Sequence, residues 1–483
     1  MPLRAKLLSQ QQQQPQSRTM ASASSLAHFP PTPADEPEDV VFQSLYGLRT
    51  IELNRPKKLN ALNGSMIRKI APRLLEWAKS DMANVIVMKG AGDKAFCAGG
   101  DVQQLAKWNQ DPAINGRKKS AAYFGQEYKL DHLIATYQKP YIAFMDGITM
   151  GGGVGLSIHA PFRIATERTV FAMPETTIGF FPDVGASFFL PRMEGQVGTW
   201  LALTSEQLTG ANVFYSGVAT HYLHSTSLNA LESRLAELRF RDYDDLDRRL
   251  EVVNATIEEF VTGLPYDEPI AVAGEVRKAI DRCFRFDTVG EIMEALEGEM
   301  KNPVTNKWAS KTRETMHMRS PTSVHVTLKQ MRIGGKWNIA SAFKREFGMA
   351  SKFMGYPDFN EGVTARLVEK RKPKWRPASL EEFASEDRRQ LVDSFFLEDG
   401  KTKKLELLND ETYSEYPFKN FGVPTEKEVE DKIAEGKVKS KGEVVEYFVR
   451  EKRQKQGVKE VVSEILSRKT QEGEEGLTWV YEE

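Results

Sequence analysis

The chain has 483 residues, of which 40% are hydrophobic and 28% are charged, and its 66 basic and 67 acidic side chains almost cancel. This balance excludes a chain-wide field that would attract nucleic acid or an anionic membrane, and no apolar run approaches the roughly 18 residues of a membrane span. The length predicts about two to four domains or subdomains, and the two cysteines, Cys97 and Cys283, indicate a reducing compartment without a disulfide framework.

Residues 1–39 have the composition of a mitochondrial presequence or of a disordered tail. Residues 1–34 contain no acidic side chain, many Ser, Gln and Ala residues, and the basic residues Arg4, Lys6 and Arg18. This is typical of a presequence, whereas the glutamine run at 10–14 and the prolines that follow suit a disordered tail equally well. No continuous apolar segment follows the basic residues, so a secretory signal is not expected. We expect a protein of the mitochondrial matrix.

Residues 40–226 alternate short β-rich runs with helical segments, which is the pattern of a layered α/β fold. Strands are expected over residues 48–54, 84–90, 141–147 and within 162–172. Between the first two strands, apolar residues at helical spacing predict a helix over residues 67–80. The chain also carries two glycine-rich turns that follow strands, at residues 98–100 and 151–155.

Residues 227–377 are mostly helical in pattern, with clear segments over 289–300 and 323–331. The charge density then rises, and residues 378–483 are expected to form an added C-terminal extension. An apolar helical stripe follows a basic stretch at 450–455 in this extension and consists of Val458, Val461, Val462, Ile465 and Leu466. Such a stripe needs a surface to cover it, and the sequence leaves open whether a partner or the protein's own core provides that surface.

The glycine turns are candidate anion-binding segments of the backbone. The second turn, GGGVG, lacks the lysine and hydroxyl residue of a Walker loop and the spacing of a dinucleotide fingerprint. A strand that leads through a glycine turn into a helix instead exposes a backbone N–H with no side chain in the way. Two such N–H groups aimed at one point form an oxyanion hole. For either turn alone, tight packing is the better explanation.

The segment FAMPETTIGFFPDVGASF at residues 171–188 carries two acids and no basic residue. Two arbitrary acids usually point into water at the ends of short elements. Here Glu175 follows closely after the second glycine turn, which favours a position beside the oxyanion hole that the two glycine turns could form. Glu175 and Asp183 are therefore candidate catalytic residues, since acids that face a cleft handle protons or attack a substrate.

Several ordered motifs resemble those of the crotonase superfamily, also called the enoyl-CoA hydratase/isomerase superfamily. NRPKKLNAL at 54–62, KAFCAGGD at 94–101 and GITMGGGVGLS at 147–157 stand in the order and spacing of that family. MPETTIGFFPDVG at 173–185 resembles its 3-hydroxyisobutyryl-CoA hydrolase branch. The resemblance extends over about residues 41–377 and implies an α/β fold with a crotonase-like ββα spiral core and a helical C-terminal region. The extension has no counterpart in typical members of the branch.

The resemblance implies a role for each candidate residue. The backbone N–H groups of Gly100 and Gly152 would hold the thioester oxygen of an acyl-CoA substrate. Glu175 would be the principal catalytic carboxylate, with Asp183 as its neighbour, and Glu127 would be a further acid that lines the acyl pocket. Because CoA is part of the substrate, neither a separate cofactor nor a metal is expected.

One position separates the chemistries within the superfamily. Hydratases carry a second glutamate where this chain has Gly155, and they use the pair of glutamates to add water to a double bond. The missing acid, together with Asp183, favours hydrolysis, in which Glu175 either attacks the thioester or activates water. Both routes stay open, and an enoyl-CoA isomerase that works with one acid is the alternative chemistry. The basic segment at 55–58 would face the CoA phosphates or form an exposed turn.

Two compatible functions are therefore expected. One is the release of CoA from 3-hydroxyisobutyryl-CoA in valine catabolism. The other follows from fungal mitochondria, where a protein that resembles this branch belongs to the small ribosomal subunit. For that role we expect the extension to dock on ribosomal proteins and rRNA through its basic stretch, its apolar helix, Trp479 and Tyr481. A structural ribosomal protein with little activity is the alternative.

Overall fold

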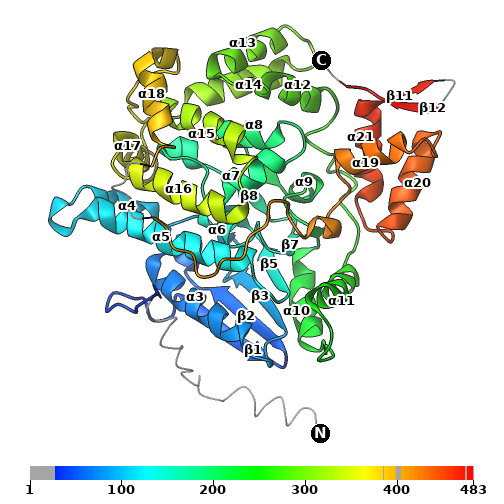
Figure 1. Cartoon of the computed structure of the whole chain (residues 1–483), viewed down its shortest axis with the longest axis horizontal. Helices are drawn as coiled ribbons and strands as arrows, with labels where there is room; N and C mark the ends of the chain where they lie inside the picture. The colour runs from blue at the N-terminus through cyan, green and yellow to red at the C-terminus, as the bar shows by residue number, and fades with distance from the viewer. Residues whose placement is uncertain (1–27, 385, 399–403, 474–475, 482–483) are drawn as a thin grey trace.

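The computed structural model describes residues 28–384, 386–398, 404–473 and 476–481, so most of the expected presequence lies outside the described residues. A 6-stranded sheet and a 4-stranded sheet form the centre of the molecule. Strands β1 (Val40–Leu45) and β2 (Leu48–Leu53) lie at the lower edge of the molecule in Figure 1, most of the helices lie above them, and the last helices lie against one side of this body. The architecture confirms the expected α/β fold with a helical C-terminal region. Within the described ranges, no helix combines the length and hydropathy that crossing a membrane requires.

The larger sheet has the strand order β1-β2-β3-β5-β7-β10. Its strands are β1 (Val40–Leu45), β2 (Leu48–Leu53), β3 (Val85–Gly90), β5 (Tyr141–Met145), β7 (Phe162–Ala165) and β10 (His221–Tyr222). β1 pairs antiparallel to β2, and the other pairs are parallel. β5 and β7 are buried along their whole length, as expected of parallel strands that are covered on both faces. β7 includes the buried Arg163, whose side chain donates to the Val218 and Ala160 carbonyls.

The smaller sheet consists of β4 (Ala95–Cys97), β6 (Ile148–Met150), β8 (Val170–Ala172) and β9 (Leu208–Thr209). β4, β6 and β8 are parallel neighbours, whereas β9 pairs antiparallel to β8. Because the carboxyl ends of neighbouring parallel strands meet at one edge of a sheet, the turns that follow these three strands come close together.

Three helices of the N-terminal half pack close to the sheets: α3 (Gly64–Ala78), α4 (Val102–Asn109) and α5 (Gly116–Ala135). α3 confirms the expected helix, and its N-cap is Asn63, whose side chain accepts a hydrogen bond from the Met66 N–H. Its Ile67, Ile70 and Leu74 are fully buried. α5 packs against α3, α4 and α16 (Ile339–Phe353), which is why polar side chains on several of its faces are buried.

The remaining helices build the helical region and the extension. The body contains α6 (Gly152–Gly155), α7 (Ala186–Phe189), α8 (Val197–Thr204), α9 (Ala211–Tyr215), α10 (Leu228–Ala236), α11 (Leu246–Glu258), α12 (Gly274–Phe284), α13 (Val289–Glu299), α14 (Asn306–His317), α15 (Pro321–Gly334) and α17 (Pro357–Val363). The last part contains α18 (Glu386–Ser394), α19 (Glu426–Ala434), α20 (Lys441–Glu451), α21 (Val458–Lys469), and the hairpin β11 (Thr470–Gly473) and β12 (Gly476–Trp479). α13 and α15 confirm the two expected helical segments.

The apolar stripe of the extension is covered by the protein itself. Val458, Val462 and Leu466 of α21 are buried in a hydrophobic cluster formed with α19 and α20, and α21 also contacts α12 of the body. The structure thereby answers the question that the sequence left open. Part of the basic stretch at 450–455 also faces the protein itself, because Lys455 is buried and its Nζ lies 2.6 Å from Glu258 Oε1 of α11.

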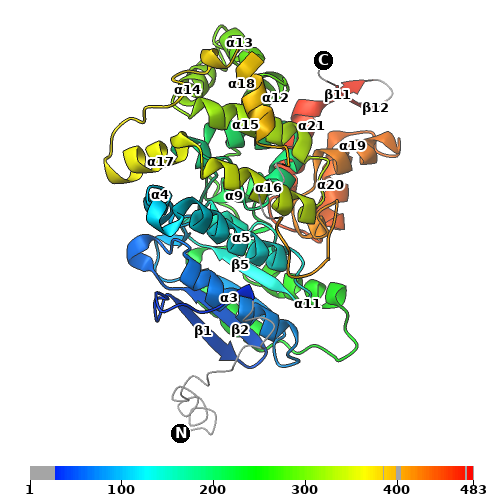
Figure 2. The same cartoon turned by 60° about the vertical axis from the view of Figure 1, so that its left-hand side comes forward.

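Within the extension, an extended segment at residues 404–423 precedes α19 and crosses the body beside α5 and α16 (Figure 2). The backbone N–H of Ile339 donates to the Tyr413 carbonyl at 3.0 Å, and the rings of Phe162 and Phe421 have centroids 4.9 Å apart. Arg163 lies over the ring of Tyr416. The segment is therefore part of the packed structure.

The fold begins earlier than the expected boundary at residue 39. Phe29 is fully buried in the main hydrophobic core, and Asp35 and Asp39 form ion pairs with Arg68 and Lys69 of α3. Residues 28–39 are therefore part of the packed structure, because an aromatic side chain and paired acids anchor this segment to the body.

Candidate active site

The turns after β4, β6 and β8 bring the predicted residues to one edge of the smaller sheet. β4 leads through Gly99 and Gly100 into α4, and β6 leads through Gly151 into α6, which begins at Gly152. β8 is followed by the 3-10 helix η3 (Glu175–Ile178). The three strands therefore place both glycine turns and Glu175 beside one another.

Both glycine turns present free backbone donors. In the part of the chain that the structure describes, the N–H groups of Gly100 and Gly152 donate to no protein group. A Cβ added at Gly152 would lie 3.3 Å from the Gly100 nitrogen, so the two backbone segments are close. Gly99, with a φ of 105°, and Gly151, with a φ of 46°, turn the chain in conformations that favour glycine. This arrangement is compatible with two N–H donors that converge on one substrate atom.

Two carboxyl groups border the second glycine turn. Glu175 Oε1 lies 3.1 Å from the position of a Cβ on Gly151, and Glu127 Oε1 lies 2.5 Å from that of a Cβ on Gly152. Both acids are almost fully buried. Glu175 Oε2 accepts no hydrogen bond from the described residues, whereas Glu127 Oε1 lies 3.4 Å from the Tyr123 hydroxyl. Glu175 therefore has an oxygen available for a substrate or a water molecule.

Asp183 lies on a loop that several buried groups hold in place. The Tyr128 hydroxyl of α5 donates to Asp183 Oδ2 at 2.6 Å. Just after Asp183, Glu346 of α16 accepts hydrogen bonds from the N–H groups of Gly185 and Ser187 at 2.7 and 2.8 Å. Sequence reasoning missed both Tyr128 and Glu346. Tyr128 stands next to Glu127, but nothing local pointed to Glu346, which reaches the loop only through the packing of α16.

A further buried acid, Asp131, occupies the place beside Gly155. Its side chain is fully buried, and neither carboxyl oxygen has a hydrogen-bond partner among the described residues. A Cβ on Gly155 would lie 2.7 Å from Asp131 Oδ2 and 2.8 Å from the Cβ of Val184. Position 155, where hydratases carry a glutamate and this chain has glycine, therefore has the carboxyl group of Asp131 next to it in the fold. The signal was available, because Asp131 follows Glu127 by one helical turn and shares its face of α5.

Burial and mutual repulsion keep these acids protonated to higher pH than ordinary carboxyl groups. Burial, followed by the charge of Asp183, raises the pKa of Glu175 and of Glu127 well above the usual range. Burial and then Glu127 do the same for the pKa of Asp131. Burial raises the pKa of Asp183 to about 7, although the hydrogen bond from Tyr128 opposes this shift. Among the described residues, no ion pair neutralises Glu175, Asp183, Glu127 or Asp131.

The basic segment at 55–58 is divided between the interior and the surface. Arg55 is buried and forms ion pairs with Glu36 and Asp101, each with a closest distance of 3.1 Å. Lys57 and Lys58 are exposed. The charge of Arg55 is therefore already neutralised inside the protein.

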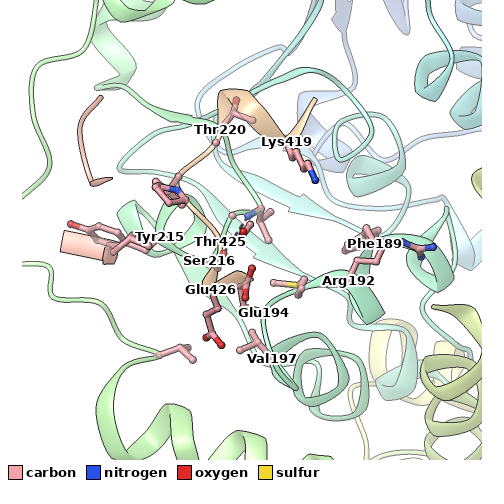
Figure 3. A pocket seen from close by; sticks show the side chains of 18 of the residues that line it. Phe189, Arg192, Glu194, Val197, Tyr215, Ser216, Thr220, Lys419, Thr425 and Glu426 are labelled. Carbon is pink, nitrogen blue, oxygen red and sulfur yellow. Dashed lines mark hydrogen bonds between the residues drawn. The ribbon is translucent and has the colours of Figure 1, made fainter. Parts of the chain in front are cut away.

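A separate cavity of about 240 Å³ lies between the body and the extension and contains none of the predicted site residues. Figure 3 shows Glu194, Val197 and Tyr215 of the body together with Lys419 and Glu426 from the last part of the chain. Burial, followed by Glu426, raises the pKa of Glu194 to about 7. This cavity belongs to the junction with the extension and not to the glycine turns.

The fold, the two glycine turns and the buried acids define a crotonase-type protein. Residues 48–396 match the family model described as enoyl-CoA hydratase/isomerase. The chain thus belongs to the enoyl-CoA hydratase/isomerase family. The crystal structure of a carnitinyl-CoA dehydratase from Mycobacterium thermoresistibile is similar, with a TM-score of 0.66, 31% identity, and coverage of 77% of this chain and 100% of that chain.

Two kinds of relative match most of the chain. Small ribosomal subunit protein mS47 of Neurospora crassa is 58% identical over 487 residues, which cover 99% of this chain and 94% of that protein. The mitochondrial 3-hydroxyisobutyryl-CoA hydrolase of Danio rerio is 42% identical over 343 residues, which cover 71% of this chain and 86% of that protein. The mS47 protein of Schizosaccharomyces pombe is 42% identical over 340 residues, which cover 70% of this chain and 76% of that protein.

Proposed function

We propose that this mitochondrial protein hydrolyses a short hydroxyacyl-CoA thioester, with 3-hydroxyisobutyryl-CoA as the substrate. The observation that supports this most is that two close glycine turns leave the N–H groups of Gly100 and Gly152 without an acceptor, and that Glu175 borders the second turn. Glu175 Oε2 accepts no hydrogen bond from the described residues. Donors and an acid in this arrangement suit acyl transfer. The identity with 3-hydroxyisobutyryl-CoA hydrolases over most of the body supports the choice of substrate.

In the proposed reaction the thioester oxygen accepts hydrogen bonds from Gly100 and Gly152. Glu175 either attacks the carbonyl carbon to form an anhydride, which water then cleaves, or removes a proton from the water that attacks. A carbon–oxygen bond forms, the carbon–sulfur bond breaks, and the CoA thiolate takes up a proton. The two N–H donors stabilise the tetrahedral oxyanion, and Asp183, held by Tyr128, keeps a proton or a water molecule close to Glu175. Glu127 lines the acyl pocket beside Gly152.

The test is the release of CoA from 3-hydroxyisobutyryl-CoA by the purified protein. Glu175→Gln, which keeps the size of the side chain, should reduce the release on the order of 100-fold or more, because it removes both nucleophilic and basic character. Wild-type protein that releases no CoA from any short hydroxyacyl-CoA would refute the proposal. Crotonyl-CoA and a 3-enoyl-CoA serve as controls for hydratase and isomerase chemistry.

We also propose that the protein is a component of the mitochondrial small ribosomal subunit. The supporting observation is its 58% identity to an mS47 protein over 99% of the chain. The experiment is co-sedimentation with mitochondrial small subunits in high salt, and sedimentation only as a free small oligomer would overturn the proposal. Truncation of the extension is a poor variant for this purpose, because residues such as Leu405 and Phe395 are buried against the body. Point changes on exposed residues are therefore needed to locate the docking surface.

A further inference from the structure

Exposed cations gather around one end of α4 although the whole chain is almost neutral. We define this basic surface by Lys107, Arg117, Lys118 and Lys119 of α4 and α5, and by Lys370, Lys372, Lys374 and Arg376 of the segment after α17. α4 packs against α5, α17 and the following π-helix η6 (Thr364–Val368), so the two groups belong to one region of the molecule. Figures 1 and 2 both show α4 and α17 side by side at the edge of the body.

The cations of this surface are poorly neutralised. None of them has an ion-pair partner within 4 Å among the described residues, whereas many other exposed cations of the chain do, including Lys427 and Arg248. The nearby acids Glu361 and Glu369 are both engaged by Arg371. Asp111 accepts a hydrogen bond from the Ala113 N–H. Uncompensated like charges repel one another, so the surface is not arranged for stability.

The placement of three of these cations also opposes the local helix electrostatics. Arg117, Lys118 and Lys119 occupy the first turn of α5, which contains no acidic residue. The partial positive charge at the start of a helix favours acids there and disfavours cations, typically by about 0.3–1 kcal/mol each. A sequence that breaks a local rule at exposed positions indicates a function for those positions.

We propose that the basic surface binds the phosphate backbone of RNA and is the face through which the protein contacts rRNA in the small subunit. This inference rests on the ribosomal role proposed above and places the RNA contact on the hydrolase body instead of the extension. A surface with several lysines and arginines that lack an ion-pair partner suits a polyanion, because each contact with a phosphate releases a counterion. The few phosphates of a CoA molecule would occupy only part of this surface.

The experiment compares two triple charge reversals in the full-length protein. One is Arg117→Glu, Lys118→Glu and Lys372→Glu on the basic surface, and the control is Lys439→Glu, Arg450→Glu and Lys459→Glu on the exposed face of the extension. Binding to a transcript of the mitochondrial small-subunit rRNA is measured across salt concentrations, beside co-sedimentation with small subunits. Two of the three new glutamates lie in the first turn of α5 and the third replaces the exposed Lys372, so that variant should melt no lower than the wild type.

We expect the reversal on the basic surface to weaken RNA binding at least 10-fold, to lower the slope of log affinity against log salt by about 1 for each cation removed, and to reduce co-sedimentation. The extension variant should behave like the wild type, and both variants should retain CoA release.

If the wild type co-sediments and the basic-surface variant does so equally well, the proposed surface is wrong and the ribosomal role stands. If the wild type binds RNA through this surface but never sediments with subunits, the ribosomal role falls instead. If free CoA, at concentrations near the KM of the acyl-CoA substrate, competes with RNA for the protein, the surface belongs to the substrate and the RNA proposal is overturned.

Discussion

Asp131 Oδ2 lies 2.7 Å from the point that a Cβ on Gly155 would occupy. The acid that hydratases carry at the position of Gly155 is therefore excluded by another acid that comes from α5. Val184, whose Cβ lies 2.8 Å from the same point, closes the space from the loop that carries Asp183. The packing of α5, α6 and the loop that carries Asp183 therefore leaves no room for a glutamate side chain at position 155.

We expect Gly155→Ala to lower the free energy of unfolding by about 1–3 kcal/mol, because a methyl group would press against both Asp131 and Val184 in a packed core. Gly155→Glu should lower it further and should not create hydratase activity. Thermal and denaturant unfolding measure the change. Gly298→Ala is the matched control, since a Cβ there meets nothing within 4 Å in α13 and should be neutral or stabilising by roughly 0.5–1 kcal/mol. Equal stability of Gly155→Ala and wild type would contradict the packing described here.

Asp131→Asn should stabilise the protein at pH 7. In the unfolded chain this acid is ionised at neutral pH, whereas burial and Glu127 raise its pKa in the folded protein well above the usual range of an aspartate. A raised folded pKa means that stability is complete below the unfolded pKa and is lost as pH rises toward the folded pKa. The asparagine does not titrate, so its advantage over wild type should grow from about pH 4 to pH 7.

Denaturant unfolding of both proteins across this pH range measures the advantage. Asp410→Asn, on an exposed side chain, is the control and should run parallel to the wild type. An advantage of Asp131→Asn that is the same at pH 4 and pH 7 would show that Asp131 binds the same number of protons in the folded and in the unfolded wild-type chain.

CoA release should increase with pH through the neutral range instead of near pH 4.5. Glu175 must be ionised to attack or to accept a proton, and burial together with Asp183 raises its pKa well above 4.5. Asp183→Asn removes the repelling charge, so the acid limb of the kcat/KM profile should move to lower pH, even though the rate at its maximum falls. Asp267→Asn, at an exposed position, should leave the limb in place. A limb that is unchanged in Asp183→Asn would separate this residue from the ionisation of Glu175.

Gly152→Ala should reduce kcat on the order of 100- to 1000-fold, because a Cβ would meet Glu127 Oε1 at 2.5 Å and shift one of the two backbone donors. Gly290→Ala is the control, since a Cβ there meets nothing within 4 Å. Steady-state kinetics of CoA release, with circular dichroism to verify folding, measure the effect. Full activity of a folded Gly152→Ala protein would remove the Gly152 N–H from the mechanism.

Glu426→Ala should detach the extension from the body. Glu426 Oε1 lies 3.0 Å from Arg277 Nη2 of α12 and 2.5 Å from Arg468 Nη2 of α21, and both arginines are buried. Removing the shared carboxylate leaves two buried charges without this partner, which typically costs about 3–5 kcal/mol. Limited proteolysis should then cut between the body and α19 at lower protease concentration. Glu259→Ala, which breaks an exposed pair with Arg234, should cost about 1 kcal/mol or less and leave proteolysis unchanged.

The sequence by itself determined the alternating strands and helices of the body, the turns at Gly100 and Gly152, and Glu175 as their neighbour. These features follow from local rules, because hydrophobic periodicity and glycine turns are written in consecutive residues. The helix over 67–80 and the strands around 48–54 and 84–90 were predictable for the same reason. The acids of the 171–188 segment were unneutralised in the sequence, and they are unneutralised in the structure.

Only the tertiary structure decided which surface covers α21 and which acids share the site. The apolar stripe required some cover, but covering α21 with α19, α20 and α12 depends on packing between segments that are far apart in the chain. Glu346 reaches the Asp183 loop, and Asp131 reaches Gly155, across similar separations. Such contacts depend on how helices pack in three dimensions, and no local periodicity encodes them.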